Sequence, residues 1–190
     1  MRSEGSSSGQ RKSPFSNDEY GGLTIHNAVL RGIPEVVLKL VEGGVDINSV
    51  GNGGATPLHM AAISEPGQHI VDTLVRLGAD PHLEDEFGYT PLHRFTISNL
   101  IYGAASVLTH GADPNHPGPD SSTPLHLCAA LEHGEAMAEI LLSFGANPLL
   151  TNNSGQRPLD VATQAGTEAV QKCLEEAVAV AEKFSPPDGA

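Results

Sequence analysis

Apolar residues recur along the chain in short stretches with helical spacing, and polar turn residues separate these stretches. Ile70, Val71, Leu74 and Val75 fall on one side of a helix, and an apolar run at 140–142 marks a second such segment. Each stretch ends at a glycine, the residue that most easily takes the left-handed conformation that stops a helix. The pattern therefore predicts a series of short helices joined by turn-rich segments.

The helical stretches follow a repeating sequence signal. Thr-Pro-Leu-His occurs at 56–59, 90–93 and 123–126, with spacings of 34 and 33 residues, and weaker copies occur at 23–26 and 157–160. A second signal is a glycine followed by Val or Ala and then Asp or Asn. It lies 12 residues before the next copy each time and starts at Gly44, Gly78, Gly111 and Gly145. Two signals in register over five units predict a repeat protein.

The chain resembles the ankyrin-repeat family, whose unit is about 33 residues long and opens its first helix with Thr-Pro-Leu-His-x-Ala. Residues 56–61 match this motif in full, whereas 90–95 end in Phe and 123–128 end in Cys. The resemblance covers roughly residues 23–183. It implies an all-α solenoid of about five helix-turn-helix units with four β-hairpin fingers, and a concave face that binds proteins.

The repeat register divides the chain into one domain and two tails. The ankyrin-repeat domain is predicted to span 19–184, with units that start near 23, 56, 90, 123 and 157. Residues 1–18 are rich in Ser and Gly and are expected to be disordered, and 185–190 are expected to form a flexible tail. Ser13 precedes a proline and follows two basic residues, which makes it a candidate phosphorylation site.

The motif also has a physical explanation that does not depend on the family. Its threonine can cap a helix whose first backbone N–H groups lack partners, and its proline lies where a missing N–H costs nothing. The unit that starts at Thr90 departs from the pattern, because Phe95 replaces a small residue and Gly103 replaces a large one. These opposite changes in volume predict that the two residues compensate for each other in the core.

Nine histidines raise the question of a metal site. His26, His59, His93 and His126 occupy one position in successive units, and packed helices lie about 8–10 Å apart. Zinc ligands must come within about 2.0–2.1 Å of the ion, so histidines one repeat apart are too far apart to share it. We therefore expect no metal and no other cofactor. The resemblance implies a structural role instead, with hydrogen bonds to neighbouring turns.

The sequence carries no motif of a familiar catalytic site. It has no phosphate-binding loop and no His-Glu-x-x-His, and its Gly-x-Ser-x-Gly at 5–9 lies in the Ser- and Gly-rich stretch that is expected to be disordered, so it forms no nucleophile elbow. The glycine-rich run at 51–54 leads into a Thr-Pro cap, and no pattern pairs two carboxylates in a cleft. We expect a protein without enzymatic activity.

The net charge of −13 bears on the kind of partner. It disfavours nucleic acid, whose binding needs a basic surface, and it favours a protein with a basic surface through electrostatic steering. The alternative is that the acidic residues only keep the protein soluble. In either case we expect binding to proteins rather than to nucleic acid or membranes, and a monomer outside its complex.

The concave face implied by the resemblance carries the predicted partner-binding residues. Phe87 and Tyr89 flank the glycine of one finger, and Glu84 and Glu86 add an acidic rim. The other predicted positions lie on neighbouring fingers or at the exposed ends of first helices: Asn52, Ile63, Ser64, Ile97, Ser98, Asp120 and Leu131. Exposed aromatic and aliphatic anchors would supply most of the binding energy. The alternative is that Tyr89 covers its own finger and Phe87 packs on the next one.

The predicted function is a protein–protein interaction module, and the alternative is a regulatory subunit, inhibitory or in assembly, of an enzyme complex. No apolar run reaches the length of a membrane span, and the first residues lack the apolar stretch of a secretory signal. Cys128 and Cys173 lie more than a repeat apart and are expected to be reduced thiols. We therefore expect an intracellular protein, cytoplasmic or nuclear and not secreted.

Asn48 is a candidate modification site. The spacing of Leu40, Asp46, Ile47 and Asn48 matches that seen where ankyrin finger asparagines are hydroxylated. A turn asparagine that makes local hydrogen bonds is the favoured interpretation.

Overall fold

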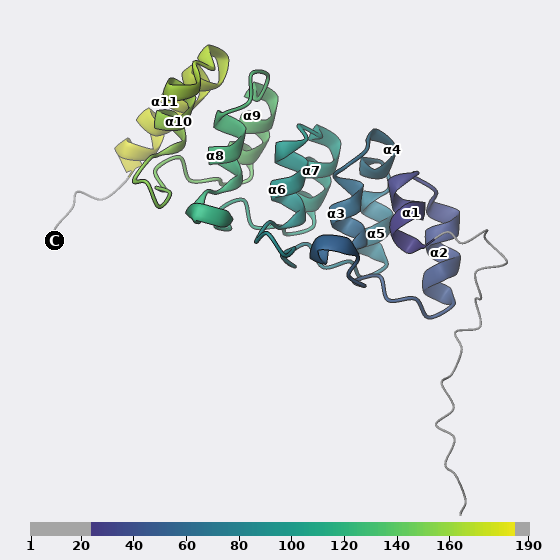
Figure 1. The fold of residues 1–190 in the computed structure, drawn as a ribbon. Coiled ribbons are helices and arrows are strands. Elements are labelled where there is room, and N and C mark those ends of the chain that lie inside the picture. Colours follow the sequence, from purple (N-terminus) through teal and green to yellow (C-terminus); the bar gives the residue numbers. More distant parts are fainter. Residues whose placement is uncertain (1–23, 185–190) are drawn as a thin grey trace, which may run out of the picture.

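Helices follow one another in pairs, and the pairs stack side by side along the molecule (Figure 1). The computed structural model describes residues 24–184, so the predicted tails at 1–18 and 185–190 lie outside the described residues. The first helices of the units are α1 (Ile25–Leu30), α3 (Pro57–Ala61), α6 (Pro91–Ile97), α8 (Pro124–Ala129) and α10 (Pro158–Ala165). The second helices are α2 (Pro34–Glu42), α5 (Val71–Arg76), α7 (Ile101–Thr109), α9 (Glu135–Ser143) and α11 (Glu168–Phe184). A short extra helix, α4 (Glu65–Gln68), lies between α3 and α5.

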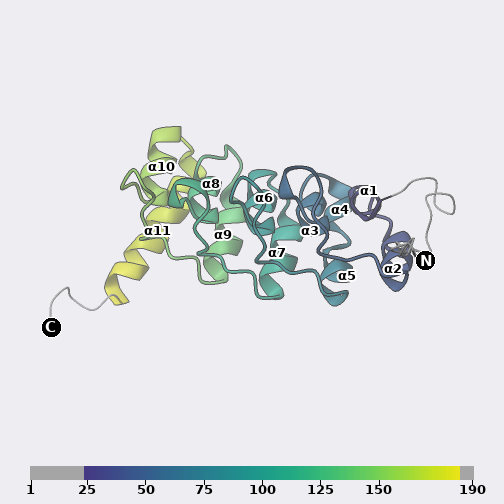
Figure 2. The same ribbon diagram turned by 60° about the horizontal axis from the view of Figure 1, so that its bottom comes forward.

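The helices form two layers. Figure 2 shows α1, α3, α6, α8 and α10 in one row and the second helices in another. The all-α solenoid of five units is confirmed, and within residues 24–184 no helix is long and apolar enough to cross a membrane.

The core lies between the layers and between successive units. Leu58, Leu92 and Leu125 of the first helices are fully buried, as are Leu74 and Leu141 of the second helices. Each buried leucine contributes about 1.5–3 kcal/mol relative to an exposed one. Because every unit buries its leucines against its neighbours, each unit depends on the adjoining units for its stability.

The helix starts follow the motif. Helices α3, α6 and α8 each begin at the proline, after a threonine with an extended backbone. In all three, the threonine backbone N–H donates to Nδ1 of the motif histidine over 3.2 Å. The histidine ring thus completes the cap from the third helical position, which satisfies a backbone donor that would otherwise lack a partner.

The predicted compensation between Phe95 and Gly103 is confirmed. Phe95 is fully buried, and a Cβ added to Gly103 would lie 2.1 Å from its ring carbon Cε1. The ring of Phe95 therefore occupies the volume that a side chain at 103 would need. The two helices α6 and α7 pack closely because one large and one small residue share a single site.

The four fingers are present, but they are not β-hairpins. They comprise finger 1 (44–55), finger 2 (78–89), finger 3 (111–122) and finger 4 (145–156), and no residue between 24 and 184 lies in a β-strand. The two arms of each finger share a single backbone hydrogen bond next to the tip, as from Asp85 N to Tyr89 O in finger 2 (2.9 Å). The arms are too short to form a ladder, so the tips are turns rather than paired strands.

Finger 3 contains prolines at 117 and 119, and its sequence predicts a shape different from that of the other fingers. The prediction is wrong for finger 1, whose turn finger 3 repeats, and it holds for fingers 2 and 4, whose tips each have a single residue with positive φ. Asp120 and Ser121 have φ values of 55° and 57°, close to the 69° and 71° of Gly53 and Gly54. Aspartate tolerates this left-handed region better than most residues, which allows the same turn without glycine.

Candidate functional site

A hollow of about 320 Å³ opens where fingers 1 and 2 meet helices α3 and α6. Five of the predicted partner-binding residues line it: Asn52, Ile63, Phe87, Ile97 and Ser98. Residues from four separate elements therefore meet at one place on the finger side of the first helices.

Three large apolar side chains stand exposed around this hollow. Phe87 is 64% exposed, Ile63 62% and Ile97 41%. Phe87 also packs on finger 1, since a Cβ on Gly53 would lie 3.4 Å from its ring. The alternative that Phe87 packs on a neighbouring finger is thus correct, yet most of the ring stays accessible. Apolar side chains gathered at one exposed place are typical of an interaction surface.

An ion pair, Asp85 with Arg94, lies in the wall of the hollow. Nε of Arg94 donates to Oδ2 of Asp85 at 2.7 Å, and the carboxylate is 2% exposed. The guanidinium carbon lies 4.6 Å from the ring centre of Tyr89 and 5.5 Å from that of Phe87. Burial alone would raise the pKa of Asp85, but hydrogen bonds from Arg94 and from backbone N–H groups lower it below its usual value.

Asp85 also fixes the shape of finger 2. Its Oδ1 accepts the backbone N–H of Phe87 at 2.9 Å and that of Tyr89 at 3.1 Å. A side-chain acceptor that binds its own turn two and four residues on holds that turn in one conformation. The aromatic ring of Phe87 is therefore presented by a rigid turn that Arg94 ties to helix α6.

Tyr89 is half-buried and is not a free surface residue. Its backbone carbonyl accepts a hydrogen bond from Nε2 of His59 at 2.9 Å, and its ring covers Arg94. The ring of Tyr89 therefore packs against helix α6 instead of standing exposed as the predicted anchor.

The predicted hydrogen bond from a motif histidine to a neighbouring turn is found for three of the four histidines. Nε2 of His26 lies 3.0 Å from Ser49 O, and Nε2 of His126 lies 3.0 Å from Gln156 O. Nε2 of His59 lies in the same way 2.9 Å from Tyr89 O. Because Nδ1 accepts a backbone N–H in the capped helices, the ring proton must lie on Nε2. Burial lowers the pKa of both His59 and His126, although the finger carbonyls oppose the shift.

His93 is the exception. Its ring is fully buried, and its Nε2 forms no hydrogen bond with the described residues. Burial lowers the pKa of His93 to about 4, helped by the nearby His116, while the carbonyls of Ser122 and His116 lie near enough to oppose this. The carbonyls approach the nitrogen without reaching hydrogen-bond geometry, so one buried polar atom stays unsatisfied.

The other predicted residues lie outside the hollow. Glu84, Glu86 and Asp120 are exposed, and Leu131 is half-buried beyond α8. Ser64 lacks the free hydroxyl that its register suggested. It donates to Leu30 O at 2.7 Å and accepts Gly67 N–H at 3.1 Å, which starts helix α4.

Asp85 and Arg94 were not among the predicted site residues. Asp85 carries a turn signal, because an aspartate three residues before Gly88 is typical of a type I turn. Nothing in the repeat pattern indicates that its second oxygen faces Arg94, nine residues later on a helix. Within the described part of the chain, no group of three or more His, Cys, Asp or Glu could hold a metal ion.

The amide of Asn48 is used within the structure. Its Nδ2 donates to Gly78 O at 3.0 Å, and its Oδ1 accepts Asp80 N–H at 2.9 Å. These bonds agree with the favoured interpretation of a structural turn asparagine. Cys128 and Cys173 are free, and burial raises the pKa of Cys128 to about 12.

Comparison with known proteins agrees with the stack of capped helix pairs. A family model described as ankyrin repeats in three copies matches residues 10–85 and 102–181, which is most of the chain. The chain belongs to the ankyrin-repeat family. Ankyrin repeats are in general protein–protein interaction modules.

Curated relatives share the repeats within longer proteins. SH3 and multiple ankyrin repeat domains protein 2 of Homo sapiens is 30% identical over 166 residues, covering 70% of this chain and 9% of that protein. Tyrosine-protein kinase Shark of Drosophila melanogaster is 30% identical over 174 residues, which cover 86% of this chain and 18% of that protein. Probable 26S proteasome regulatory subunit p28 of Saccharomyces cerevisiae is 29% identical over 153 residues, which cover 76% of this chain and 64% of that protein. The chain thus spans less than two thirds of each of these relatives.

Proposed function

We propose that this ankyrin-repeat protein binds a partner protein through the hollow between fingers 1 and 2 and helices α3 and α6. The observation that carries the proposal is the exposure of Ile63, Phe87 and Ile97 around one hollow. Leaving three large apolar side chains in water has no benefit for the isolated fold, whereas a partner that covers them gains their burial.

The electrostatics favour a partner with basic residues beside its apolar contact. Among the described residues that line the hollow, Arg94 is the one cation, and it is already paired with Asp85, so it does not oppose an incoming positive charge. Glu84 and Glu86 on finger 2 are exposed and can face a basic side chain. The net charge of −13 would also speed the encounter with such a partner.

The rigidity of the site supports tight binding by few residues. Asp85 holds the turn that carries Phe87, and Gly53 O accepts the backbone N–H of Glu86 at 2.9 Å, which joins the two fingers. A site that is ordered before binding loses little entropy on docking, so the apolar anchors contribute more of their contact energy.

A regulatory subunit of an enzyme complex is the second candidate function. Among the three relatives described, the one named as a proteasome regulatory subunit is matched over the largest share of its own length, 64%. In this case the partner would be an enzyme or one of its subunits. Assaying a captured partner's activity with and without this chain distinguishes this function from simple binding.

We also propose that the domain spans 19–184 as one unit and acts inside the cell as a monomer without catalytic activity. Two free cysteines, one of them buried with a raised pKa, fit a reducing compartment. Size-exclusion chromatography with light scattering checks the monomer.

The test of the binding site uses peptides selected on the wild-type protein from a random display library. The double variant Phe87→Ala with Ile97→Ala should bind the selected peptides at least roughly thirtyfold more weakly, as expected for the loss of anchor residues. The matched control is Tyr102→Ala, because Tyr102 is an aromatic residue that is 72% exposed on helix α7. It should leave affinity unchanged. Peptides that bind the folded double variant as tightly as the wild type would place the site elsewhere.

A further inference from the structure

Fingers 1 and 2 are joined by polar bonds from one finger to the next. The amide of Asn48 donates to Gly78 O at 3.0 Å and accepts Asp80 N–H at 2.9 Å. At the tips, Glu86 N–H donates to Gly53 O at 2.9 Å. Near the base, His59 donates to the carbonyl of finger 2. Three of these hydrogen bonds join the two fingers directly, and the fourth ties finger 2 to helix α3, which follows finger 1. Together they hold the two fingers as one plate.

Fingers 3 and 4 repeat the same bonds at the same positions. The amide of Asn115 donates to Gly145 O at 2.9 Å and accepts Asn147 N–H at 2.7 Å. At the tips, Asn153 N–H donates to Asp120 O at 2.8 Å. His126 again reaches the carbonyl at the base of finger 4. These two fingers therefore form a second plate of the same construction.

The junction between fingers 2 and 3 lacks all of these bonds. His82 stands in register with the bridging asparagines, and no bridge from it to finger 3 forms among the described residues. Pro119 stands in register with Glu86 and has no N–H to donate. His93 is in register with the bonding histidines, but the carbonyls of Ser122 and His116 near its Nε2 do not reach hydrogen-bond geometry. At this junction, three positions therefore lack the hydrogen bonds that their counterparts form at the other two junctions.

Weaker contacts fill this junction. His116 Nε2 of finger 3 lies 3.5 Å from Glu84 Oε1 of finger 2, and both side chains are partly exposed. The rings of His93 and His116 meet edge to face with centres 6.0 Å apart. At the tips, the position of a Cβ on Gly88 is 3.7 Å from the Pro119 ring. The partly exposed contact between His116 and Glu84 and the van der Waals contacts hold this junction less firmly than hydrogen bonds to backbone groups hold the other two.

We propose that the finger side of the molecule consists of two rigid plates, fingers 1–2 and fingers 3–4, and that the junction between them is a hinge. The pivot is the helix layer, where α6 packs against α8 and Asn99 Nδ2 donates to His133 O at 2.9 Å. The fingers open and close while this layer stays packed. The hinge does not depend on the proposed function.

One consequence does rest on that function. Both fingers that line the hollow belong to the first plate, whereas Asp120 belongs to the second. A partner confined to the hollow leaves the hinge free. A partner that also touches finger 3 must hold the hinge at one angle, so its affinity depends on the hinge.

Amide hydrogen exchange followed by NMR tests the hinge without any partner. The N–H groups of Asp80 and Asn147 are bonded across their junctions, and the N–H of Asp113, in register with them, donates no hydrogen bond among the described residues. Asp113 should therefore exchange roughly tenfold faster than the other two, as expected for one missing hydrogen bond. Equal protection at all three positions would overturn the proposal.

Substitution of His82 sharpens this test. His82→Asn places a bridging amide at the middle junction, and it should slow the exchange of Asp113 to the rate of Asp80. His82→Ala, the matched control, removes the ring without adding a bridge and should leave Asp113 fast. Asn48→His should have the opposite effect and speed the exchange of Asp80. Failure of His82→Asn to protect Asp113 in a folded protein would contradict the assignment.

Spin labels report the motion itself. In a background with both cysteines replaced, labels at exposed positions 86 and 117 bracket the hinge, and labels at 117 and 151 bracket the junction inside the second plate. The first pair should give the broader distance distribution, and His82→Asn should narrow it. Equal widths for the two pairs would show that the middle junction moves no more than its neighbours.

Discussion

At the scale of single residues, the motif histidine takes part in two contacts that require a neutral ring. Nδ1 accepts the threonine N–H that opens the helix, and Nε2–H reaches toward the next finger. A second proton would convert Nδ1 from an acceptor to a donor and break the cap. Acid should therefore weaken caps and finger contacts together.

The pH dependence of stability should be strongest through His93. Its pKa is about 4 in the folded chain, against an ordinary value of 6.5, so the unfolded chain binds more protons between these values. The free energy of unfolding is therefore highest above pH 6.5, falls as the pH drops toward 4, and changes no further from this group below that. The fall from His93 alone should be roughly 3 kcal/mol.

Denaturant unfolding of the wild type and of His93→Gln across this pH range measures the effect. The variant should be less stable at neutral pH, because it loses the ring that completes the cap, but its stability should depend less on pH. Parallel pH profiles for the two proteins would show that His93 is not the group responsible.

Asp85 combines three hydrogen bonds in one buried carboxylate. Asp85→Ala leaves Arg94 and two backbone N–H groups without their partner, so the free energy of unfolding should fall by about 2–3 kcal/mol. The selected peptides should also bind more weakly, since Phe87 loses its rigid turn. Glu86→Ala, an exposed neighbour, should change stability by less than about 0.5 kcal/mol. Thermal and urea unfolding check both variants, and equal stabilities would contradict the role of Asp85.

At the scale of helices, one pair of residues decides how α6 and α7 pack. Gly103→Ala removes a helix-interior glycine, which by itself would stabilise by about 1 kcal/mol. The new methyl group meets the Phe95 ring, which is fully buried and has no room to move, and overpacking of this kind costs about 1–3 kcal/mol. Gly103→Ala should therefore destabilise the wild type.

A double-mutant cycle with Phe95→Leu separates the two effects. In the Phe95→Leu background the ring is gone, so adding Gly103→Ala should be neutral or stabilising by up to about 1 kcal/mol. The sign of the alanine effect should thus depend on residue 95. Urea unfolding of the four proteins checks this, and an additive result would mean that the two residues do not share one volume.

Local and periodic features of the helices could be predicted from the sequence. Local or repeat-periodic signals predict where the helices start, the glycines at which they stop, and the volume compensation between Phe95 and Gly103. All three features are found in the structure. The likeness of finger 3 to finger 1 was not predicted, because the positive φ values of Asp120 and Ser121 decide the turn rather than the proline content.

The candidate site was predicted only in part. Phe87, Ile63 and Ile97 could be found because exposed apolar residues at known repeat positions stand out. Arg94 was missed because its partner lies on a loop, and sequence spacing does not show which loop side chain faces which helix. The unsatisfied Nε2 of His93 was missed for the opposite reason, since the repeat predicts a bond that local geometry prevents.

At the scale of the whole molecule, the excess of acidic residues acts on folding and binding in opposite ways. Like charges repel more strongly in the compact chain than in the unfolded one, so the net charge of −13 destabilises the fold. The same charge attracts a basic partner from a distance. Salt screens both interactions, because the Debye length shrinks to about 8 Å at physiological ionic strength.

Raising the salt concentration from low to moderate should therefore raise the melting temperature and weaken the binding of basic selected peptides.

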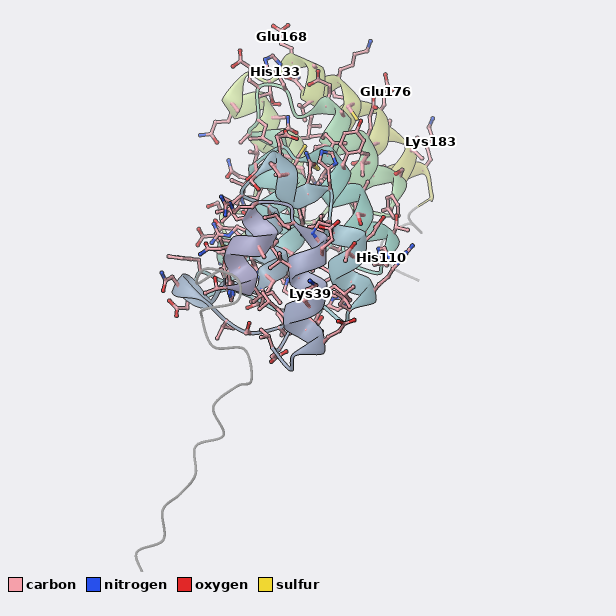
Figure 3. All side chains as sticks on the ribbon, turned by 90° about the vertical axis from the view of Figure 1, so that its right-hand side faces the viewer. Lys39, His110, His133, Glu168, Glu176 and Lys183 are labelled. Carbon is pink, nitrogen blue, oxygen red and sulfur yellow. The ribbon has the colours of Figure 1, made fainter. Side chains whose placement is uncertain are left out.

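Two matched substitutions separate the effect of net charge from the effect of charges beside the hollow. Glu86→Gln lies beside the hollow, and Glu176→Gln lies on α11, where Figure 3 shows the side chain projecting away from the body of the molecule. Each removes one negative charge from an exposed position. Both should therefore raise the melting temperature slightly at low salt, whereas only Glu86→Gln should weaken peptide binding and reduce its salt dependence. Thermal melts and peptide titrations at two salt concentrations make the comparison. Equal effects on affinity from the two sites would mean that the partner responds to net charge alone and not to the acidic edge of finger 2.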